Sequence, residues 1–359
     1  MNALAVSTTP TPGVDWLAVA PVAVLALAAV LIVLQRAIMR RSPAAYPVSM
    51  AIAVVGLAST VVALVAQWDR VQTDGAYQAL SGMVAVDGAA VFVGGVVVLA
   101  TSLALLLASR YLERERLDAP EFLALMLLSA SGMIAMASAN DLIAVFVALE
   151  IVSIPLYVLA AFDRRRSASL ESGLKYFLLG AFASAVFLYG VALTYGATGT
   201  TGLTGIATFL AGTTLIEQGT LLAGLVLMLV GLGFKVAAAP FQMWTPDVYQ
   251  GAPTPVTAFM ASATKAAGFI ALLRILSTAL GSYSSDWRPV VWVLAVLSLL
   301  VGSIGAAVQT DVKRMLAYSS VNHAGFILIG VEAATRRGVA ATLSYLAIYA
   351  FLAVGSFAV

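Results

Sequence analysis

The segment GFKVAAAPFQMWTPDVYQGAPTPVTAFMASATKAAGF, residues 233–269, decides how this chain folds. It places a lysine in each of two apolar runs, at Lys235 and Lys265, and puts four prolines between them: Pro240, Pro246, Pro253 and Pro255. A proline inside a helix removes a backbone hydrogen bond and breaks or kinks the helix. In a membrane such a break persists only where protein or a cavity satisfies the freed backbone groups. The segment therefore predicts a transmembrane helix broken near Pro240, with charged side chains beside the break.

The composition of the whole chain excludes a soluble domain. Of 359 residues, 62% are hydrophobic and 10% are charged, which leaves too little polar surface to wet a fold of this size. No cysteine and a single histidine exclude disulfides, thiolate metal sites and multi-histidine metal sites within the chain. A net charge of +2 gives no argument for nucleic acid, and neither a GxxxxGK[ST] loop nor a GxGxxG fingerprint is present.

Long continuous apolar runs favour an all-α polytopic bundle over a transmembrane β-barrel, whose strands alternate in short segments. At about 20 residues per span, eleven spans account for most of the apolar residues. The predicted spans are 16–34, 47–67, 86–109, 121–139, 141–162, 171–196, 219–239, 256–280, 289–308, 315–331 and 338–359. No basic region precedes the first run, so we expect a retained helix rather than a cleaved signal. The last run reaches Val359 without a polar tail, which suggests a C-terminally incomplete bundle.

The distribution of loop cations predicts the orientation. One set of alternate loops holds eleven Lys and Arg: Arg36, Arg40, Arg41, Arg110, Arg114, Arg116, Arg164, Arg165, Arg166, Lys313 and Arg314. The other set holds four: Arg70, Arg288, Arg336 and Arg337. By the positive-inside rule the first set is cytoplasmic, and the N-terminus lies outside. The loop 197–218 is then external, and the proline-rich loop 240–255 internal.

Charges inside apolar runs are the candidates for function, because each costs about 3 kcal/mol or more at the bilayer centre. Glu150 lies near the middle of its span, where a proton-relay acid or a carboxylate that merely neutralises a neighbouring lysine would both fit. Lys235 and Lys265 lie on successive spans, where the alternative of snorkelling to the interface explains them poorly, and small residues beside Lys265 leave room for water. Lys175 lies one turn inside its span and could instead snorkel to the interface. Arg274 is expected to be an interfacial anchor.

His323, the only histidine, lies near the middle of the span 315–331. Its unperturbed pKa of about 6.5 suits proton transfer at physiological pH. The alternative is a histidine that only hydrogen-bonds a neighbouring helix. Tyr345 and Tyr349 share one helical face and could continue a polar path. Asp87, at the start of the third span, is expected to be an interfacial or helix-capping carboxylate.

The quoted segment resembles the signature of the antiporter-like membrane subunits of respiratory complex I. Further stretches resemble other helices of that family: LEIVSIPLYVLAAF (149–162), ESGLKYFLLGAFASAVFLYG (171–190) and TDVKRMLAYSSVNHAGFILIG (310–330). The similarity runs from about Asp87 to the end of the chain, while the first 80 residues match only in hydropathy. TPDVYQGAP (245–253) is typical of the N-type subunit rather than of the L and M types or of Mrp-type cation/proton antiporters.

The resemblance implies a role for each buried charge. Glu150 takes the position of the fifth-helix glutamate, Lys175 of a sixth-helix lysine, Lys235 of the lysine on the broken seventh helix, and Lys265 of the eighth-helix lysine. Gln242 stands where many relatives carry histidine. The family's two inverted repeats imply N-terminal helices over 1–120, a first repeat over 121–280 and the start of a second over 281–359.

The function that the resemblance implies is proton translocation within a bacterial type I NADH-quinone oxidoreductase in the cell membrane. Glu150, Lys175, Lys235, Lys265 and His323 would form the proton relay. No cofactor is expected in this chain, since NADH, FMN, iron–sulfur clusters and quinone would belong to partner subunits. The expected partners are the antiporter-like M and L subunits, the small A, J and K subunits, and the lipid bilayer. Two alternatives are a subunit of an Mrp-type cation/proton antiporter and a membrane scaffold without ion transport.

Overall fold

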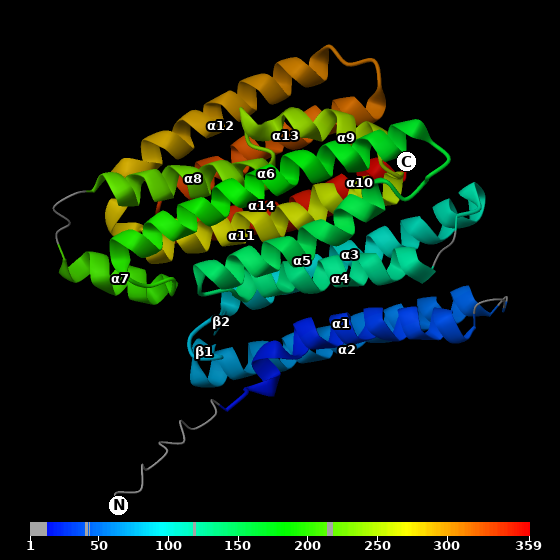
Figure 1. Ribbon diagram of the computed structural model, residues 1–359, viewed down its shortest axis with the longest axis horizontal. Coiled ribbons are helices and arrows are strands. Elements are labelled where there is room, and N and C mark those ends of the chain that lie inside the picture. The colour runs from blue at the N-terminus through cyan, green and yellow to red at the C-terminus, as the bar shows by residue number, and fades with distance from the viewer. Residues whose placement is uncertain (1–12, 40–41, 43, 118–119, 214–217) are drawn as a thin grey trace, which may run out of the picture.

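The computed structural model describes residues 13–359 except 40–41, 43, 118–119 and 214–217. It is a bundle of long, roughly parallel helices (Figure 1). The first six long helices are α1 (Trp16–Ile38), α2 (Ala45–Asp74), α3 (Gly88–Glu115), α4 (Pro120–Ser138), α5 (Leu142–Ala160) and α6 (Ser167–Thr198). A short antiparallel hairpin, β1 (Tyr77–Ala79) and β2 (Val84–Val86), joins α2 to α3.

The second half of the chain contains the broken helices. A short helix α7 (Leu203–Gly212) precedes α8 (Gly219–Val236), which is followed by the 3-10 turn η1 (Phe241–Trp244) and by α9 (Thr245–Gly251). The next span joins α10 (Thr254–Phe259), the π turn η2 (Met260–Thr264), α11 (Lys265–Leu273) and the π turn η3 (Arg274–Ala279). After the 3-10 turn η4 (Gly281–Tyr283) come α12 (Ser284–Ala307), α13 (Val312–Glu332) and α14 (Arg336–Ala358).

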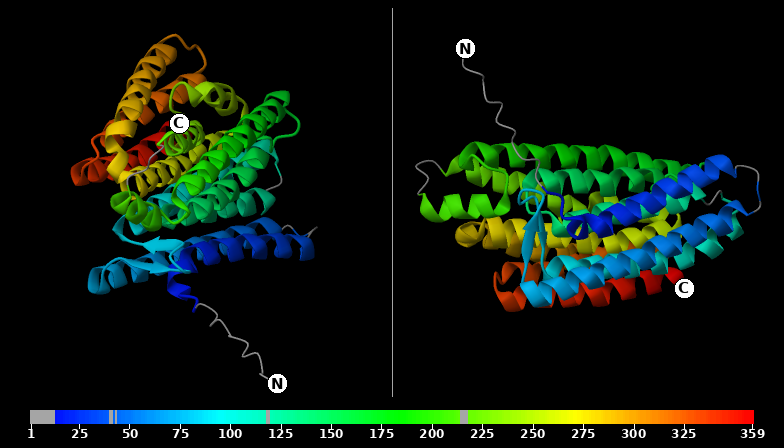
Figure 2. Two further views of the ribbon diagram at one scale, coloured as in Figure 1. Left: turned by 60° about the vertical axis from the view of Figure 1, so that its left-hand side comes forward. Right: turned by 90° about the horizontal axis from the view of Figure 1, so that it is seen from below.

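The helices are layered around one central span. α1 and α2 form the outer layer on one side and pack against α4 and α3, while α12 and α13 lie on the opposite side (Figures 1 and 2). The span Thr254–Ala279 lies between them and is buried over its whole apolar window. Lys265 therefore belongs to the most enclosed helix of the bundle, where a charge is most expensive.

The predicted transmembrane bundle is confirmed. Among the described residues, ten helices are long and apolar enough to cross a membrane. The remaining predicted span, 315–331, coincides with α13, which packs against α12 and α14. Aspartates cap four of the described helices: Asp15, Asp87, Asp141 and Asp311 accept backbone N–H groups in the first turns of α1, α3, α5 and α13.

Two predicted loops contain helices. Within 240–255, Pro246 and Pro255 each lie in the first turn of a helix, α9 and α10, where a proline sacrifices no hydrogen bond. Within 197–218, α7 forms because Leu203, Ile206 and Leu210 fall on one face and become buried. We name the two ends of the bundle from these features. The hairpin end carries β1, β2 and α7, and the cation-rich end carries Arg114, Arg165, Arg166, Lys313 and Arg314.

Candidate functional site

The break predicted near Pro240 lies between α8 and η1, and its freed backbone groups have partners in the protein. The Phe234 carbonyl accepts a hydrogen bond from the Trp244 indole nitrogen at 3.1 Å. The Ala239 amide donates to Ser298 Oγ on α12 at 2.9 Å. A backbone break at membrane depth requires such partners. The break is therefore a built feature, which ends α8 one residue after Lys235.

Lys235 is held by a neutral oxygen. Its side chain is 5% exposed, and its Nζ donates to Ser153 Oγ on α5 at 2.7 Å. The ring of Tyr176 on α6 lies 6.0 Å from the ammonium nitrogen, which suits a weak cation–π contact. The structure thus brings α5, α6 and α8 together around this amine.

Glu150 lies on α5 one turn before Ser153. The residue is partly buried, and its Oε1 atom is enclosed without a hydrogen-bond partner among the described residues. The lysine amine nearby contacts Ser153 and not this carboxylate. A buried carboxylate oxygen without a partner is uncommon, because an unmade hydrogen bond costs about 1–3 kcal/mol. It marks an oxygen that is free to take a new partner.

Lys265 opens α11 directly after the π turn η2, and π turns inside helices are frequent at functional sites. The side chain is 2% exposed, and its Nζ donates to the backbone carbonyl of Ser320 on α13. The Tyr349 ring of α14 lies 5.5 Å from Nζ. As with Lys235, the partner is a neutral oxygen.

Gly268 brings the helices of the two lysines into contact. A Cβ atom at this position of α11 would lie 2.8 Å from Val236 Cγ1 and 3.5 Å from Lys235 Cγ. Only a residue without a side chain allows α8 to approach α11 so closely. The stem of Lys235 therefore lies against the turn of α11 that follows Lys265.

His323 continues the polar row beyond Lys265. Its Nδ1 lies 2.7 Å from the Tyr345 hydroxyl, and its ring centroid is 4.7 Å from that of Tyr349. Tyr349 thus contacts both the histidine ring and the lysine amine. The structure thus brings Tyr345 and Tyr349 together with His323, and the polar path through them stays a prediction.

The structure places Lys175 apart from this row. Its amine lies 2.7 Å from Asp247 and 2.6 Å from Glu171, and Asp247 also binds Arg314 at 2.7 Å. The Lys175 side chain is 41% exposed at the cation-rich end, where it lines a polar cavity of 530 Å³. The relay role of Lys175 stays a prediction, and the contacts found here are those of a surface charge cluster.

Arg274 lies near the hairpin end of its span, as expected, but its side chain is buried inside the protein. Its side chain is 8% exposed, and its guanidinium lies 2.8 Å from Asp87 and donates to the Ala137 carbonyl at 2.7 Å. Asp87 also caps α3, as predicted. The pair joins η3, α3 and α4 near the hairpin end. A permanently charged arginine with so buried a side chain requires such a counter-charge.

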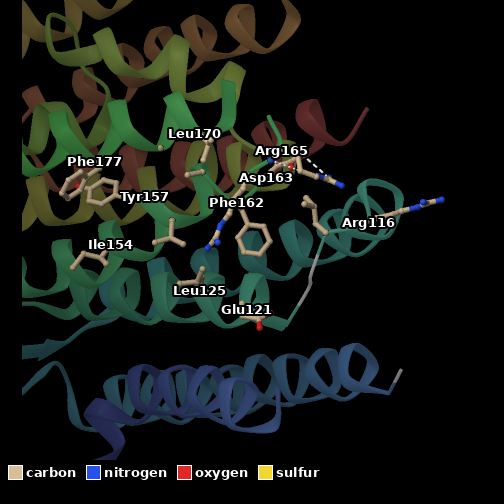
Figure 3. Close-up of a pocket in the computed structure, with 15 residues that line it drawn as sticks. Arg116, Glu121, Leu125, Ile154, Tyr157, Phe162, Asp163, Arg165, Leu170 and Phe177 are labelled. Atoms are coloured by element: carbon tan, nitrogen blue, oxygen red, sulfur yellow. Dashed lines mark hydrogen bonds and ion pairs between the residues drawn. The ribbon is translucent and has the colours of Figure 1, made fainter. Parts of the chain in front are cut away.

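A groove of 890 Å³ lies between α4, α5 and α6 at the cation-rich end (Figure 3). Its rim includes Asp163, which accepts a hydrogen bond from the Arg165 guanidinium at 2.9 Å. That bond lowers the pKa of the Asp163 carboxyl below its usual value. Apolar side chains such as Ile154 and Phe177 line the part of the groove away from Asp163 and Arg165. Tyr157 also lines it, so this tyrosine stands between the groove and the buried site.

Sequence reasoning missed Ser153 and Tyr176 as neighbours of Lys235. A detectable signal for Ser153 was its spacing, because a residue three positions after Glu150 shares its helical face. No comparable signal marked Tyr176. Gln242 lies in η1, and its side-chain oxygen is buried without a partner among the described residues. Among the residues that the structure describes, no three His, Asp or Glu side chains lie close enough together to bind a metal ion.

Comparison with known proteins gives consistent results. Residues 139–359 match the family model described as NADH:quinone oxidoreductase/Mrp antiporter, TM. The chain is 43% identical to NADH-quinone oxidoreductase subunit N of Mycobacteroides abscessus, over 97% of this chain and 70% of that protein. A chain in the structure of respiratory complex I from Thermus thermophilus with bound aureothin is 36% identical, with a TM-score of 0.74 over 94% of this chain and 70% of that one. A chain of the Mrp complex from Dietzia shares the fold, with a TM-score of 0.80 at 22% identity over 95% of this chain and 64% of that one.

Proposed function

Since this chain belongs to the subunit N family of NADH-quinone oxidoreductase, we propose that it moves protons through the row of buried groups from Glu150 to His323. The family makes it a proton-translocating membrane subunit of that enzyme. Its partners are other antiporter-like membrane subunits. Electron transfer from NADH to quinone, with FMN and iron–sulfur clusters, belongs to partner subunits in this proposal.

The observation that carries the proposal is the way the two lysines are held. Lys235 and Lys265 are 5% and 2% exposed, and each amine donates to a neutral oxygen. Desolvation penalises the charged form of an amine, and among the described residues neither amine is in hydrogen-bond contact with a carboxylate. Such a lysine can release its proton when the local field changes, whereas a paired lysine is held charged.

The proposed cycle starts at Glu150. Redox events in partner subunits change the electrostatics around this carboxylate, whose unpartnered oxygen can accept a proton or attract the amine of Lys235. A proton that leaves Lys235 moves toward Lys265, on the helix that Gly268 brings into contact. His323 and Tyr345 then extend the path toward α14. Moving one charge against 100 mV costs about 2.3 kcal/mol, which sets the size of the field changes required.

Replacing Glu150 with Gln tests the proposal, because glutamine keeps the shape and removes the titrating proton. We expect normal assembly and NADH-driven proton pumping reduced about a hundredfold, the low end of what a proton-transfer group contributes. Glu150→Asp should retain part of the activity. Pumping is followed with a pH-sensitive dye in vesicles that contain equal amounts of assembled complex. A Gln variant that pumps like the wild type, beside an Ala variant that fails to assemble, would make the carboxylate structural and favour the scaffold alternative.

The same assay separates this function from that of an Mrp-type antiporter. A proton pump coupled to quinone reduction stops when NADH is withheld. A cation/proton antiporter continues to exchange protons against an imposed sodium gradient. Exchange driven by sodium without NADH would therefore contradict the proposal.

The proposed orientation puts the cation-rich end in the cytoplasm and the N-terminus outside, because the loops of that end carry most of the Lys and Arg. A chain without cysteine accepts single engineered thiols cleanly. We expect an impermeant maleimide to label Ser284→Cys in intact cells, and Arg114→Cys or Arg165→Cys only after the membrane is opened. Labelling of Arg165→Cys in intact cells would reverse the orientation.

A further inference from the structure

We propose that Ser153 is a positioning residue of the pump, which holds the amine of Lys235 one helical turn away from Glu150. The inference rests on the proposed function and deepens it, because it names the group that keeps the two charges apart. Ser153 is 1% exposed, contacts the amine of Lys235 and follows Glu150 by one turn of α5.

The hydrogen bonds of Ser153 fix its role as an acceptor. Its hydroxyl donates to the Leu149 carbonyl and accepts from Lys235 Nζ at 2.7 Å. A hydroxyl has one proton to donate, and that proton is used on the backbone of its own helix. A lone pair of the same oxygen accepts the hydrogen bond of the amine. Ser153 can therefore hold the amine but cannot itself neutralise its charge.

Lys235 has a choice between two acceptors on one helix. Ser153 follows Glu150 by three residues, so the hydroxyl and the carboxylate lie on the same face of α5 about one turn, or roughly 5 Å, apart. The four-carbon lysine stem spans such a distance by rotating its side-chain bonds.

The structure describes the arrangement in which the amine is on Ser153 and the Glu150 oxygen is free. The opposite arrangement pairs the amine with the carboxylate and leaves the Ser153 lone pairs empty. A hydroxyl acceptor lowers the cost of the separated arrangement, because a buried amine without any partner would be drawn to the carboxylate. The pump alternates between the two arrangements, and Ser153 sets their balance.

Removing the hydroxyl should therefore trap the pair. In Ser153→Ala we expect NADH-driven pumping to fall about tenfold, since a hydrogen bond to a charged group shifts an equilibrium by at least that factor. Ser153→Thr keeps the hydroxyl and should restore most of the rate. Ser129→Ala is the matched control, because the Ser129 hydroxyl is equally buried and donates to the Val152 carbonyl of α5 without contacting Lys235.

The pH profile distinguishes positioning from packing. The titratable groups that face Lys235 from the elements packed against it are Glu150 and Tyr157 on α5, Tyr176 on α6 and, across Gly268, Lys265 on α11. Loss of the Ser153 hydroxyl should shift the pH profile of pumping, because it changes how often the Lys235 amine is paired with the Glu150 carboxylate. Ser129→Ala should leave that profile in place. If both alanine variants lower the rate equally with unchanged pH profiles, Ser153 is only a packing residue and the inference is wrong.

A double-mutant cycle completes the test in the assembled complex. With Glu150→Gln already present, Ser153→Ala should have no further effect on the residual turnover, since there is no carboxylate from which to hold the amine. A full tenfold loss on that background would overturn the inference. Wild-type pumping in Ser153→Ala alone, beside an inactive Glu150→Gln, would also overturn it and leave the proposed function standing. Should the alanine variant not assemble, Ser153→Cys carries the same measurements, because its thiol fills the site but accepts hydrogen bonds weakly.

Discussion

Lys265 and Arg274 lie nine residues apart on one membrane span, and the protein treats the two charges differently. Lys265, near the middle of the span, donates to a backbone carbonyl. Arg274, nearer the hairpin end, is neutralised by the Asp87 carboxylate and also donates to a carbonyl. Both side chains are more than nine-tenths buried. The difference teaches that burial of a charged side chain does not by itself identify a relay residue. The charge of the group that it contacts distinguishes the two cases.

The rule extends to the other charged regions. A guanidinium stays protonated under all physiological conditions, so its burial requires a permanent counter-charge. Lys175 is paired with two carboxylates at the cation-rich end and in this respect resembles Arg274. Lys235 is bound to a serine hydroxyl and resembles Lys265. In the centre of the bundle, the amines of Lys235 and Lys265 thus donate to neutral oxygens. At the two ends, Lys175 and Arg274 form ion pairs with carboxylates.

The largest effect is expected when the central lysine is replaced by a residue of the type found at the hairpin end, in Lys235→Arg. An arginine keeps the positive charge and cannot release its proton. We expect Lys235→Arg to reduce pumping about a hundredfold, nearly as much as Lys235→Ala. Proton uptake on NADH addition, in membranes holding equal amounts of assembled complex, gives the ranking. Simple charge pairing with Glu150 gives the opposite order, and an active arginine variant would remove Lys235 from the relay.

A smaller and different effect is expected from Arg274→Gln, which leaves the carboxylate of Asp87 without its partner. The Arg274 side chain is 8% exposed and that of Asp87 30%, so losing this half-buried pair should cost roughly 1–3 kcal/mol, and the assembled complex should be less abundant and melt at lower temperature. Pumping per assembled complex should stay within about twofold of wild type, since no step of the proposed cycle uses this charge. Asp87→Asn, which keeps an oxygen to cap α3, gives the reciprocal variant. Normal assembly with abolished pumping would place Arg274 in the relay and end the contrast with Lys265.

The smallest effect is expected from Lys175→Ala. Its ion pairs are partly exposed, and such pairs contribute about 0–1 kcal/mol. We expect little change in thermal stability and a change in pumping of less than about twofold. Glu171→Ala removes one partner of the same cluster and serves as its control. A hundredfold loss of pumping in Lys175→Ala alone would show that the sequence-based relay assignment was right.

The order of the spans was predictable, while the pairing of their side chains was not. Hydropathy sums over about 20 neighbouring residues, so a span such as α5 is visible without its surroundings. The break at Pro240 was equally local, because a proline at that place interrupts any helix. Pro246 and Pro255 were harder to interpret, because the same residue that ends one helix favours the first turn of the next.

The identity of the buried partners depends on which helices meet. Arg274 looks like an interfacial anchor in its own span, and only the approach of α3 brings Asp87 to it. Ser153 shares a face with Glu150, which the sequence displays, but its contact with Lys235 depends on the packing of α5 against α8. Local patterns therefore identify the charged residues, and tertiary packing decides what each can do.

The position of Tyr157 can be stated in electrical terms. Tyr157 lines the groove between α4, α5 and α6, its ring packs 4.8 Å from Tyr176, and Tyr176 faces the amine of Lys235. Two aromatic rings, those of Tyr157 and Tyr176, thus separate the amine of Lys235 from the molecules that fill the groove. The energy of a charge depends on the polarisability of its surroundings over several ångströms. The molecules that fill the groove therefore contribute to the effective dielectric constant around Lys235. Replacing a hydrocarbon there with water would change the free energy of protonating Lys235 without any change in the sequence of this chain.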